Sequence, residues 1–256
     1  MSQNIKSVTH SRPNALRFIH KFLAQNDVNE NIVLDLSAGG GYVANLFDKK
    51  NAKVEAFDLY PELLANANIK CTKIDLNDKL SISSDYADCV LLMETIDHIA
   101  NQYQLFQEIS RILKPDGKLI LTKPNNSNII GRLANLWLES ERSDMFLVNE
   151  NTIIGYDENR PYLGRLFLCG VQKLRTLAEI HGLKIDKIYP NQISVSSILW
   201  FTIIGWFFIF RTYLTYFKLK RKANLMERKA LKEQFEINKN RRILFHKHLC
   251  IVFVKK

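Results

Sequence analysis

The sequence predicts an α/β fold in which a parallel sheet is wound with helices. Short apolar runs of strand length recur along the first half of the chain, and helix-length segments separate them. Strands that alternate with helices form parallel sheets through right-handed crossovers. The chain has 256 residues, of which 46% are apolar and 24% are charged, so it can bury a full core. We therefore expect one domain over residues 1–256.

The first half of the chain is expected to begin with a helix, which precedes five strands separated by helix-length segments. Apolar residues recur at helical spacing from Ala15 to Leu23, and Pro13 suits the first turn of a helix over residues 12–24. Ligands of such sheets gather at the carboxyl ends of the strands, so functional residues are expected just after each strand. The expected strands are Ile32–Leu36, Val54–Phe57, Cys71–Ile74, Asp88–Met93 and Lys118–Thr122.

The region after the fifth strand is more mixed. Residues 124–164 are polar and aromatic, and we expect them to be irregular. Helical spacing over residues 171–181, ended by Gly182, predicts a helix before a sixth strand at Leu183–Tyr189. A last strand is expected at Leu249–Val254.

An apolar and then basic helical insertion is expected over residues 194–240, before the last strand. Residues 194–217 carry Arg211 as their only charge, and residues 198–210 are apolar on every helical face. Residues 223–239 are charged and predict an amphipathic helix. A helix that is apolar all round is unusual for a surface insertion in a soluble domain.

A glycine-rich loop follows the first strand. Val33–Leu36 runs directly into Ser37–Gly41, whose three glycines let the backbone turn sharply into a helix and approach a ligand. About twenty residues later, Asp58 ends the second strand, where a carboxylate can accept hydrogen bonds from ribose hydroxyls. The pair indicates a nucleoside site. Taken alone, Gly39–Ala44 also fits the dinucleotide pattern GxGxxA, so a nicotinamide-dependent oxidoreductase is an alternative.

Further motifs follow the strands in order along the chain. They are Asp35 before the glycine loop, Asp75–Asn77 after the third strand, residues 88–99 around the fourth strand and Arg111–Gly117 before the fifth. Together with the glycine loop, this set resembles the ordered motifs of class I S-adenosylmethionine-dependent methyltransferases.

The resemblance covers residues 32–125 well, extends more weakly to residue 188 and resumes at residues 249–256. It implies a Rossmann-like seven-stranded sheet flanked by helices, parallel except for an antiparallel last strand. It also implies methyl transfer from S-adenosylmethionine, and it is strongest to the small-molecule methyltransferases whose acceptors are quinones, lipids or glycans.

The resemblance also assigns the residues expected to bind the methyl donor. They are Asp35, Ser37, Gly39 and Gly41 for the methionine part, Asp58 for the ribose, Asp75 and Leu76 beside the adenine, and Met93 and Glu94 on the sulfonium side. One position departs from the family, because Ser37 stands where the family usually has the first glycine of its pattern. Serine is small enough to be tolerated there.

Methyl transfer needs positioning and desolvation more than a dedicated nucleophile, and it needs a base only if the acceptor carries a proton. In the family, the segment Glu94–His98 faces the methyl group and the acceptor. His98 is the candidate base, and the alternative is a side chain that only caps the turn. The spacing of Glu94, Asp97 and His98 also resembles a segment that binds a divalent ion in some quinone O-methyltransferases, although our interpretation includes no metal.

Candidates for an acceptor pocket lie in the variable region before the sixth strand. Arginine and tyrosine there would suit an anionic or phosphate-bearing acceptor, but a solvated loop carries the same residue types. The candidates are Tyr156, Asp157, Arg160, Tyr162 and Arg165.

The formal charge of +10 is concentrated after the apolar segment, which favours an anionic membrane surface over nucleic acid as a partner. The last strand must return to the sheet, so we expect a monotopic anchor through residues 194–222, not a crossing. The alternatives are an oligomer contact and a hydrophobic lid over the acceptor pocket. Four widely separated cysteines and a polar N-terminus predict a cytoplasmic protein at the inner face of a membrane.

The sequence therefore predicts a methyltransferase that acts on a lipid-linked, quinone-like or envelope-glycan acceptor at a membrane surface. Two alternatives remain at this point. One is an NAD(P)-dependent oxidoreductase, and the other is a catalytically degenerate methyltransferase fold that serves as a scaffold.

Overall fold

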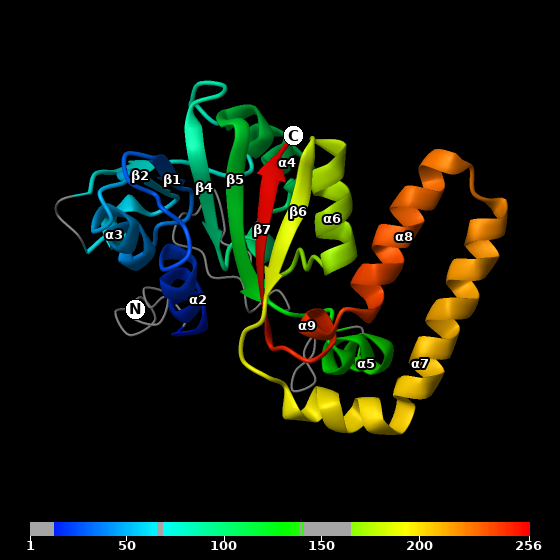
Figure 1. The fold of residues 1–256 in the computed structure, drawn as a ribbon. Coiled ribbons are helices and arrows are strands. Elements are labelled where there is room, and N and C mark those ends of the chain that lie inside the picture. The colour runs from blue at the N-terminus through cyan, green and yellow to red at the C-terminus, as the bar shows by residue number, and fades with distance from the viewer. Residues whose placement is uncertain (1–12, 66–68, 139, 141–164) are drawn as a thin grey trace. The chain divides into compact units, whose positions relative to one another are not determined.

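The computed structural model describes residues 13–65, 69–138, 140 and 165–256 (Figure 1). The chain divides into two compact units. The first comprises Met1–Lys123, Arg175–Tyr189 and Cys250–Lys256, and the second comprises Pro124–Leu174 and Pro190–Leu249. The expectation of a single domain over residues 1–256 stays a prediction.

The first unit is built on a seven-stranded sheet with the order β3-β2-β1-β4-β5-β7-β6. Parallel pairs join β1 to β2 and β4, β2 to β3, and β4 to β5, whereas β6 and β7 are antiparallel. This confirms the predicted fold, including the antiparallel last strand. The strands are β1 (Ile32–Asp35), β2 (Lys53–Asp58), β3 (Cys71–Lys73), β4 (Ala87–Met93), β5 (Leu113–Pro124), β6 (Leu183–Tyr189) and β7 (His248–Lys255).

Helices cover both faces of this sheet. Phe22 of α2 (Pro13–Leu23) and Phe47 of α3 (Tyr42–Asp48) share one buried cluster with Val252 of β7. The next residue of β7, Phe253, points to the opposite face because side chains alternate along a strand. There it contacts Phe106 of α4 (Gln102–Ile112), with ring centroids 6.2 Å apart. The sheet is therefore flanked by helices, as the family resemblance implies.

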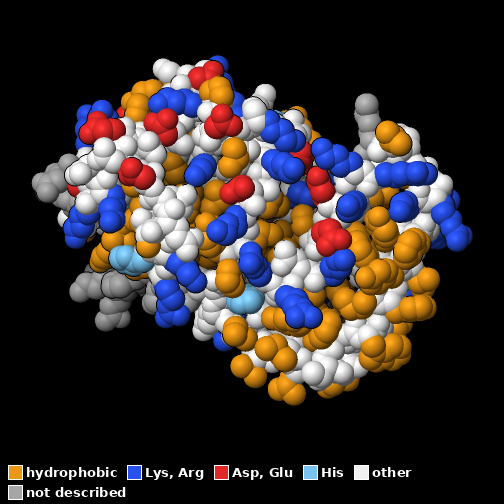
Figure 2. Space-filling view, in the orientation of Figure 1, with side chains coloured by type: hydrophobic (Ala, Val, Ile, Leu, Met, Phe, Trp, Pro, Cys, Tyr) orange, Lys and Arg blue, Asp and Glu red, His pale blue; other side chains and the backbone are white. Residues whose placement is uncertain are grey.

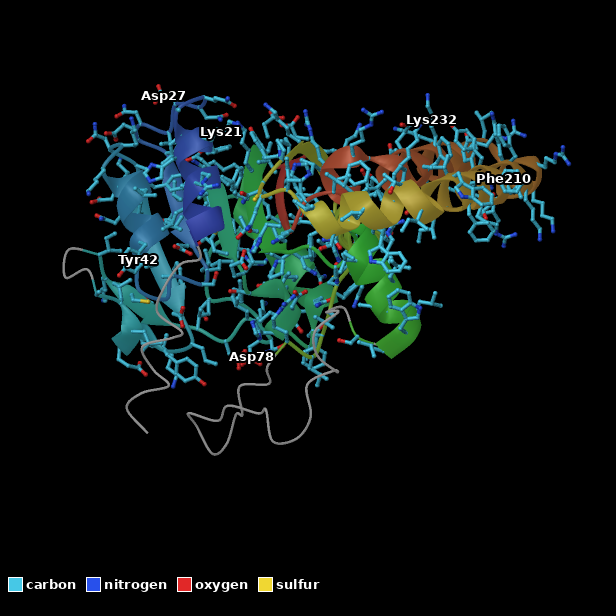
Figure 3. The ribbon with its side chains drawn as sticks, turned by 90° about the horizontal axis from the view of Figure 1, so that it is seen from below. Lys21, Asp27, Tyr42, Asp78, Phe210 and Lys232 are labelled. Atoms are coloured by element: carbon cyan, nitrogen blue, oxygen red, sulfur yellow. The ribbon has the colours of Figure 1, made fainter. Side chains whose placement is uncertain are left out.

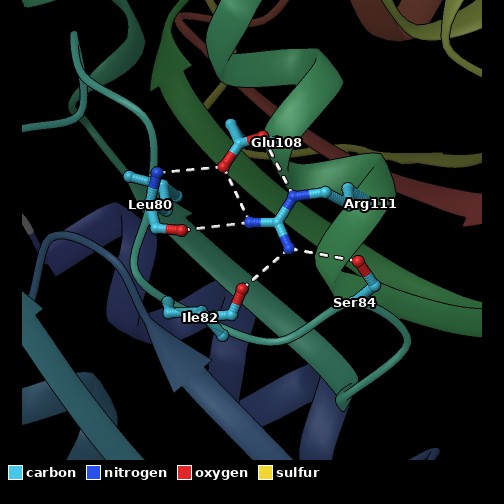
Figure 4. Close-up of polar contacts among 5 residues, drawn as sticks. All are labelled: Leu80, Ile82, Ser84, Glu108 and Arg111. Carbon is cyan, nitrogen blue, oxygen red and sulfur yellow. Dashed lines mark hydrogen bonds and ion pairs between the residues drawn. The ribbon is translucent and has the colours of Figure 1, made fainter.

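Arg111 fastens the connection between β3 and β4 to helix α4 (Figure 4). Its guanidinium donates to both carboxylate oxygens of Glu108, at 3.0 and 2.7 Å, and to the carbonyls of Leu80 and Ile82, at 3.0 and 2.7 Å. Glu108 accepts a further hydrogen bond from the Leu80 amide at 2.9 Å. Arg111 belongs to a motif matched by resemblance, and its role in this structure is to hold a loop.

In the second unit, the structure corrects one expectation. The stretch 124–164 was expected to be irregular, but it contains α5 (Ile129–Leu138). The Asn128 side chain accepts a hydrogen bond from the Gly131 amide at 2.8 Å, which supports the first turn of this helix. Polar residues such as Asn128 are typical of loops as well as of helix caps, which explains the difference.

The remaining helices confirm the insertion. The apolar segment forms α7 (Val195–Lys222) and the charged segment forms α8 (Leu225–Lys239), which starts with a capping box between Asn224 and Glu227. Figures 1 and 3 both show α7 and α8 side by side, and Figure 3 labels Phe210 on α7 and Lys232 on α8. The other elements are α6 (Val171–Ile180), α9 (Arg241–Leu244) and the short helices η1 (Pro61–Leu63) and η2 (Ile96–His98).

Candidate functional site

The predicted donor-binding residues lie at the carboxyl ends of neighbouring strands in the first unit. Asp35 ends β1, Asp58 ends β2 and Met93 ends β4, while Asp75 lies just beyond β3. The pairing of Asp35 with Ala56 and Leu91 places β1 between β2 and β4. The strand ends therefore meet at one edge of the sheet, where ligands of such sheets bind.

The glycine loop adopts the backbone that its sequence predicts. Gly39 has a φ of 50° and Gly41 a φ of 77°, both in the left-handed region that favours glycine. Gly41 caps the start of α3, and its amide donates to the Ala38 carbonyl at 2.8 Å. A Cβ atom built on Gly39 would meet nothing within 4 Å, so open space lies beside the loop.

Asp58 holds the loop in place. Its Oδ2 accepts a hydrogen bond from the Gly39 amide at 2.8 Å, and its Oδ1 accepts one from the Tyr60 amide at 2.9 Å. Burial raises the pKa of Asp58, and the hydrogen bonds from these two amides oppose the rise. Each oxygen of a carboxylate has a second lone pair, so Asp58 keeps acceptor capacity for a ligand hydroxyl.

Asp35 is the most strongly perturbed acid at this edge of the sheet. It is 1% exposed, and burial raises its pKa to about 7, with a smaller contribution from the negative charge of Asp58. A hydrogen bond from the Ser37 amide, at 3.3 Å, opposes the rise. Two neighbouring carboxyl groups at an edge open to a ligand suit a ligand that brings positive charge and hydroxyls.

Ser37 joins the first and fourth strands. Its hydroxyl accepts a hydrogen bond from the Met93 amide at 3.0 Å and donates to the Met93 carbonyl at 3.4 Å. Glycine could make neither contact. The departure from the family pattern at this position therefore has a structural role here, because the hydroxyl fixes the glycine loop to the end of β4.

The segment after β4 holds an ion pair that the sequence analysis missed. Asp97 Oδ1 lies 2.7 Å from Lys123 Nζ at the end of β5, and the two side chains are 1% and 0% exposed. Buried charges are stable only when they are paired and hydrogen-bonded. A lysine directly after the apolar run of the fifth strand was the available signal.

His98 and Glu94 lie in the same segment. His98 is partly buried at the end of η2, and its amide donates to the Thr95 carbonyl at 2.9 Å. Glu94 has a φ of 59°, an uncommon conformation for a side chain of this length. Among the residues that the structure describes, no group of three His, Cys, Asp or Glu side chains could hold a metal ion. Asp97, one member of the resembled metal segment, is paired with a lysine instead.

Asp75 and Leu76 follow β3 in the turn expected beside the adenine. Asp75 Oδ1 accepts hydrogen bonds from the amide and the side chain of Asn77, at 2.9 and 3.0 Å. Asn77 in turn accepts from the Ala100 amide at 2.9 Å, and Leu76 is buried. Asp75 thus stabilises the turn that follows β3, and Asn77 connects this turn to the segment after β4. The role of Asp75 toward a ligand stays a prediction.

These residues fit the methyl donor. S-adenosylmethionine carries an ammonium, a sulfonium and ribose hydroxyls, and this edge offers a buried carboxyl group at Asp35 and a partly buried one at Asp58, beside an open glycine loop. Asp35 and Ser37–Gly41 would hold the methionine part, and Asp58 would accept from the ribose. Of the predicted acceptor residues, Tyr156, Asp157, Arg160 and Tyr162 lie outside the described residues, and Arg165 lies in the second unit.

A pocket of about 260 Å³ lies at the opposite end of the strands. Phe22, Asn26, Asp88 and Lys118 are among its lining residues, which come from the amino ends of β4 and β5 and from the end of α2. None of the predicted site residues lines this pocket. It therefore has no part in the donor site.

Known proteins resemble this chain in sequence. The family described as "Methyltransferase domain" matches residues 8–186. A "Ubiquinone biosynthesis O-methyltransferase" from Xanthomonas oryzae pv. oryzae is 30% identical over an alignment of 104 residues that covers 37% of this chain and 44% of that protein. A relative of the same name from Xanthomonas axonopodis pv. citri is 29% identical over 104 residues, with the same coverage. The chain thus matches less than half the length of these curated relatives.

Solved structures resemble it in fold. A SAM-dependent methyltransferase from Archaeoglobus fulgidus superposes with a TM-score of 0.56 at 12% identity, covering 94% of this chain and 93% of that one. An S-adenosylmethionine-dependent methyltransferase from Mesorhizobium loti gives a TM-score of 0.51 at 14% identity, covering 94% and 96%. At such identities the likeness is one of fold.

Proposed function

Because this chain belongs to the methyltransferase-domain family, we propose that it binds S-adenosylmethionine at the ends of β1, β2 and β4 and transfers the methyl group to an acceptor. The observation that carries the proposal is the junction of Asp58 with the glycine loop, where the Gly39 amide donates to the carboxylate. This contact couples the ribose-binding acid to the loop that would hold the methionine part. The family match also disfavours the oxidoreductase alternative.

The reaction requires little covalent chemistry from the protein. The bound donor supplies a methyl carbon already activated by the sulfonium charge, so the chain contributes orientation and the exclusion of water. Ser37 and Asp58 would fix the loop against two strands, which orients the donor. His98 would accept a proton from an acceptor hydroxyl, since a neutral imidazole is well matched to that task.

For the acceptor, we propose a quinone-like, lipid-linked or envelope-glycan molecule at the cytoplasmic face of a membrane. The matched relatives named for ubiquinone biosynthesis support an apolar acceptor. The length and apolar composition of α7 support the membrane location. The four cysteines are free thiols, in keeping with a reducing compartment.

The donor assignment is tested by calorimetry with S-adenosylhomocysteine, because the experiment does not need the acceptor. We expect binding by the wild-type chain and a large loss in Asp58→Ala, with Asp78→Ala, an exposed acid just after Asp75, as the matched control. Loss of binding in both variants would point to general damage. A folded wild type that does not bind would overturn the proposal.

The acceptor is tested by turnover with radiolabelled methyl donor and membrane lipid extracts. Incorporation into a chloroform-soluble product supports the acceptor class, and His98→Asn should slow it while donor binding stays unchanged. Donor binding without incorporation into any extract would favour the remaining alternative, a methyltransferase fold that serves as a scaffold.

A further inference from the structure

The outer face of α7 carries a continuous apolar stripe. Its members recur every three or four residues, which places them on one face of the helix. The stripe consists of Leu199, Ile203, Trp206, Phe210, Leu214 and Phe217, which are between 46% and 73% exposed. From Leu199 to Phe217 it follows roughly 27 Å along the path of the helix, at 1.5 Å per residue. Figure 1 shows that α7 bends sharply along this path.

Part of the other side of α7 packs against its neighbours in the second unit, although Tyr213 there stays 41% exposed. Tyr213 and Tyr216 contact the ring of Phe235 on α8, with centroids 4.9 and 4.4 Å apart. Arg132 of α5 lies over the ring of Phe208, 4.8 Å from its centroid. Helices α5 and α8 thus contact one side of α7, whereas the stripe residues are exposed in the described structure, among them Phe210, which Figure 3 labels.

The end of α5 extends the apolar stripe. Leu136 and Trp137 are 76% and 57% exposed, and the Trp137 ring contacts Trp200 of α7 with centroids 5.6 Å apart. Tryptophan is enriched at the boundary between hydrocarbon and headgroups, because its ring is apolar and its N–H is polar. Figure 2 shows hydrophobic side chains gathered over α5 and α7.

Positive charge follows the apolar stripe directly. Helix α7 contains no acidic residue, and residues 218–229, which we call the basic tip, hold six Lys or Arg residues and one acid, Glu227. Figure 2 shows this charge where α7 meets α8. Each basic residue near an anionic bilayer contributes about 1 kcal/mol of attraction. An apolar face bordered by such a cluster is typical of helices that lie in a membrane interface.

Chain topology excludes a single crossing by α7. The helix is long and apolar enough to span a bilayer, with 11% of its most apolar window buried. However, the strands that precede and follow the insertion pair with each other, as in Ile188 with Ile251. The chain would have to return through α8, whose Glu233 and Lys232 are among many charges that hydrocarbon would not accept.

From these observations we infer that the apolar stripe, with Leu136 and Trp137, docks against an anionic lipid bilayer while the basic tip contacts the headgroups. A second copy of this chain is a poorer occupant, because its α7 has no acidic side chain to face the basic tip. The inference extends the proposed function by naming the membrane surface and its docking face. It does not depend on the donor site, because the two bind different ligands.

Flotation of the full-length chain with lipid vesicles tests this docking. We expect it to float with vesicles of phosphatidylcholine and phosphatidylglycerol, and to float much less with phosphatidylcholine alone or at high salt. The double variant Trp206→Glu, Phe210→Glu should lower the bound fraction on the order of tenfold or more, because it places charge in the apolar face. Changing Lys220, Arg221 and Lys222 to Gln should remove the preference for anionic lipid.

Ile180→Glu is the matched control, since Ile180 is 57% exposed but belongs to α6. It should float like the wild type, and all variants should bind S-adenosylhomocysteine equally well. Equal flotation of the stripe variant and the wild type would overturn the inference. So would a wild-type dimer that the stripe variant converts to monomer without any lipid binding, because the second copy would then be the occupant. If the stripe variant fails to fold, the glutamine variant and the salt series still decide.

Discussion

At the scale of single residues, the candidate site depends on buried groups whose state is set by their neighbours. Asp35 is kept from water by the sheet and the glycine loop, and its pKa of about 7 follows mainly from that burial. Lys123 and Asp97 are equally buried but compensate each other. The first of these arrangements is sensitive to pH, and the second is sensitive to the loss of either partner.

Asp35 should make the stability of the folded chain depend on pH. Its folded pKa of about 7 lies above the ordinary value of 3.8, so the folded state binds the extra proton and stability falls as pH rises between these values. The loss amounts to about 4 kcal/mol at most. Urea unfolding should show this slope in the wild type and a flatter profile in Asp35→Asn. Parallel pH profiles for the two proteins would contradict the assignment.

The ion pair between Lys123 and Asp97 gives a second prediction. Lys123→Met leaves a buried carboxylate without its cation and should destabilise the chain by about 3–5 kcal/mol. Replacing both residues, as Lys123→Met with Asp97→Leu, should recover much of that loss, because an apolar pair needs no compensation. Denaturant unfolding of the three proteins checks this. A double variant as unstable as the single variant would mean that other contacts of Asp97 dominate.

At the scale of elements, side chains from one segment hold the backbone of another. Arg111 of α4 binds the loop before β4 through two carbonyls, and Ser37 binds the glycine loop to the end of β4. Both contacts fix loops that carry no regular structure of their own. The position of the candidate donor site thus depends on hydrogen bonds between elements as well as on the sheet.

The variant Arg111→Lys tests how much the hydrogen bonds from α4 to the loop before β4 contribute to stability. Lysine keeps the charge but cannot bind a carboxylate through two nitrogens while it donates to two carbonyls. We expect a loss on the order of 2 kcal/mol in unfolding free energy, with Lys53→Ala as the control, since the ion pair of Lys53 with Glu30 is exposed. If both variants lose the same stability, the Arg111 network contributes no more than a surface pair.

At the scale of the whole molecule, the last strand completes the sheet. β7 lies between β5 and β6 in the sheet order, although it follows α9 in the chain. Its residues from Leu249 to Phe253 are buried. The two segments that enclose the insertion are therefore joined by strand pairing, and the insertion is tied to the sheet at both of its ends.

Removal of residues 250–256 should abolish cooperative folding, because β6 would lose the strand beside it and the core would lose Phe253. Lys256→Ala removes only an exposed terminal ion pair with Glu179 and should be nearly neutral. Circular dichroism melts of the two proteins provide the measurement. A truncated chain that still melts cooperatively near the wild-type temperature would show that β7 is dispensable.

The sequence by itself determined the order of strands and helices, the glycine loop, the acids at the strand ends and the apolar character of residues 194–217. These features are local, because periodicity, glycine content and the order of elements depend only on residues that are close in the sequence. It did not reveal α5, whose capping asparagine reads like a loop residue, or the pairing of Asp97 with Lys123.

Only the tertiary structure decided which polar groups are buried and which groups they contact through hydrogen bonds or ion pairs. Ser37 meets Met93 across 56 positions of sequence, and Arg111 meets Leu80 across 31. Tertiary packing also determines that Asp35 is buried and which side of α7 stays exposed. A polar group is buried, and acquires its hydrogen-bond or ion-pair partner, only where segments distant in sequence come together. A pattern of neighbouring residues therefore does not predict either one.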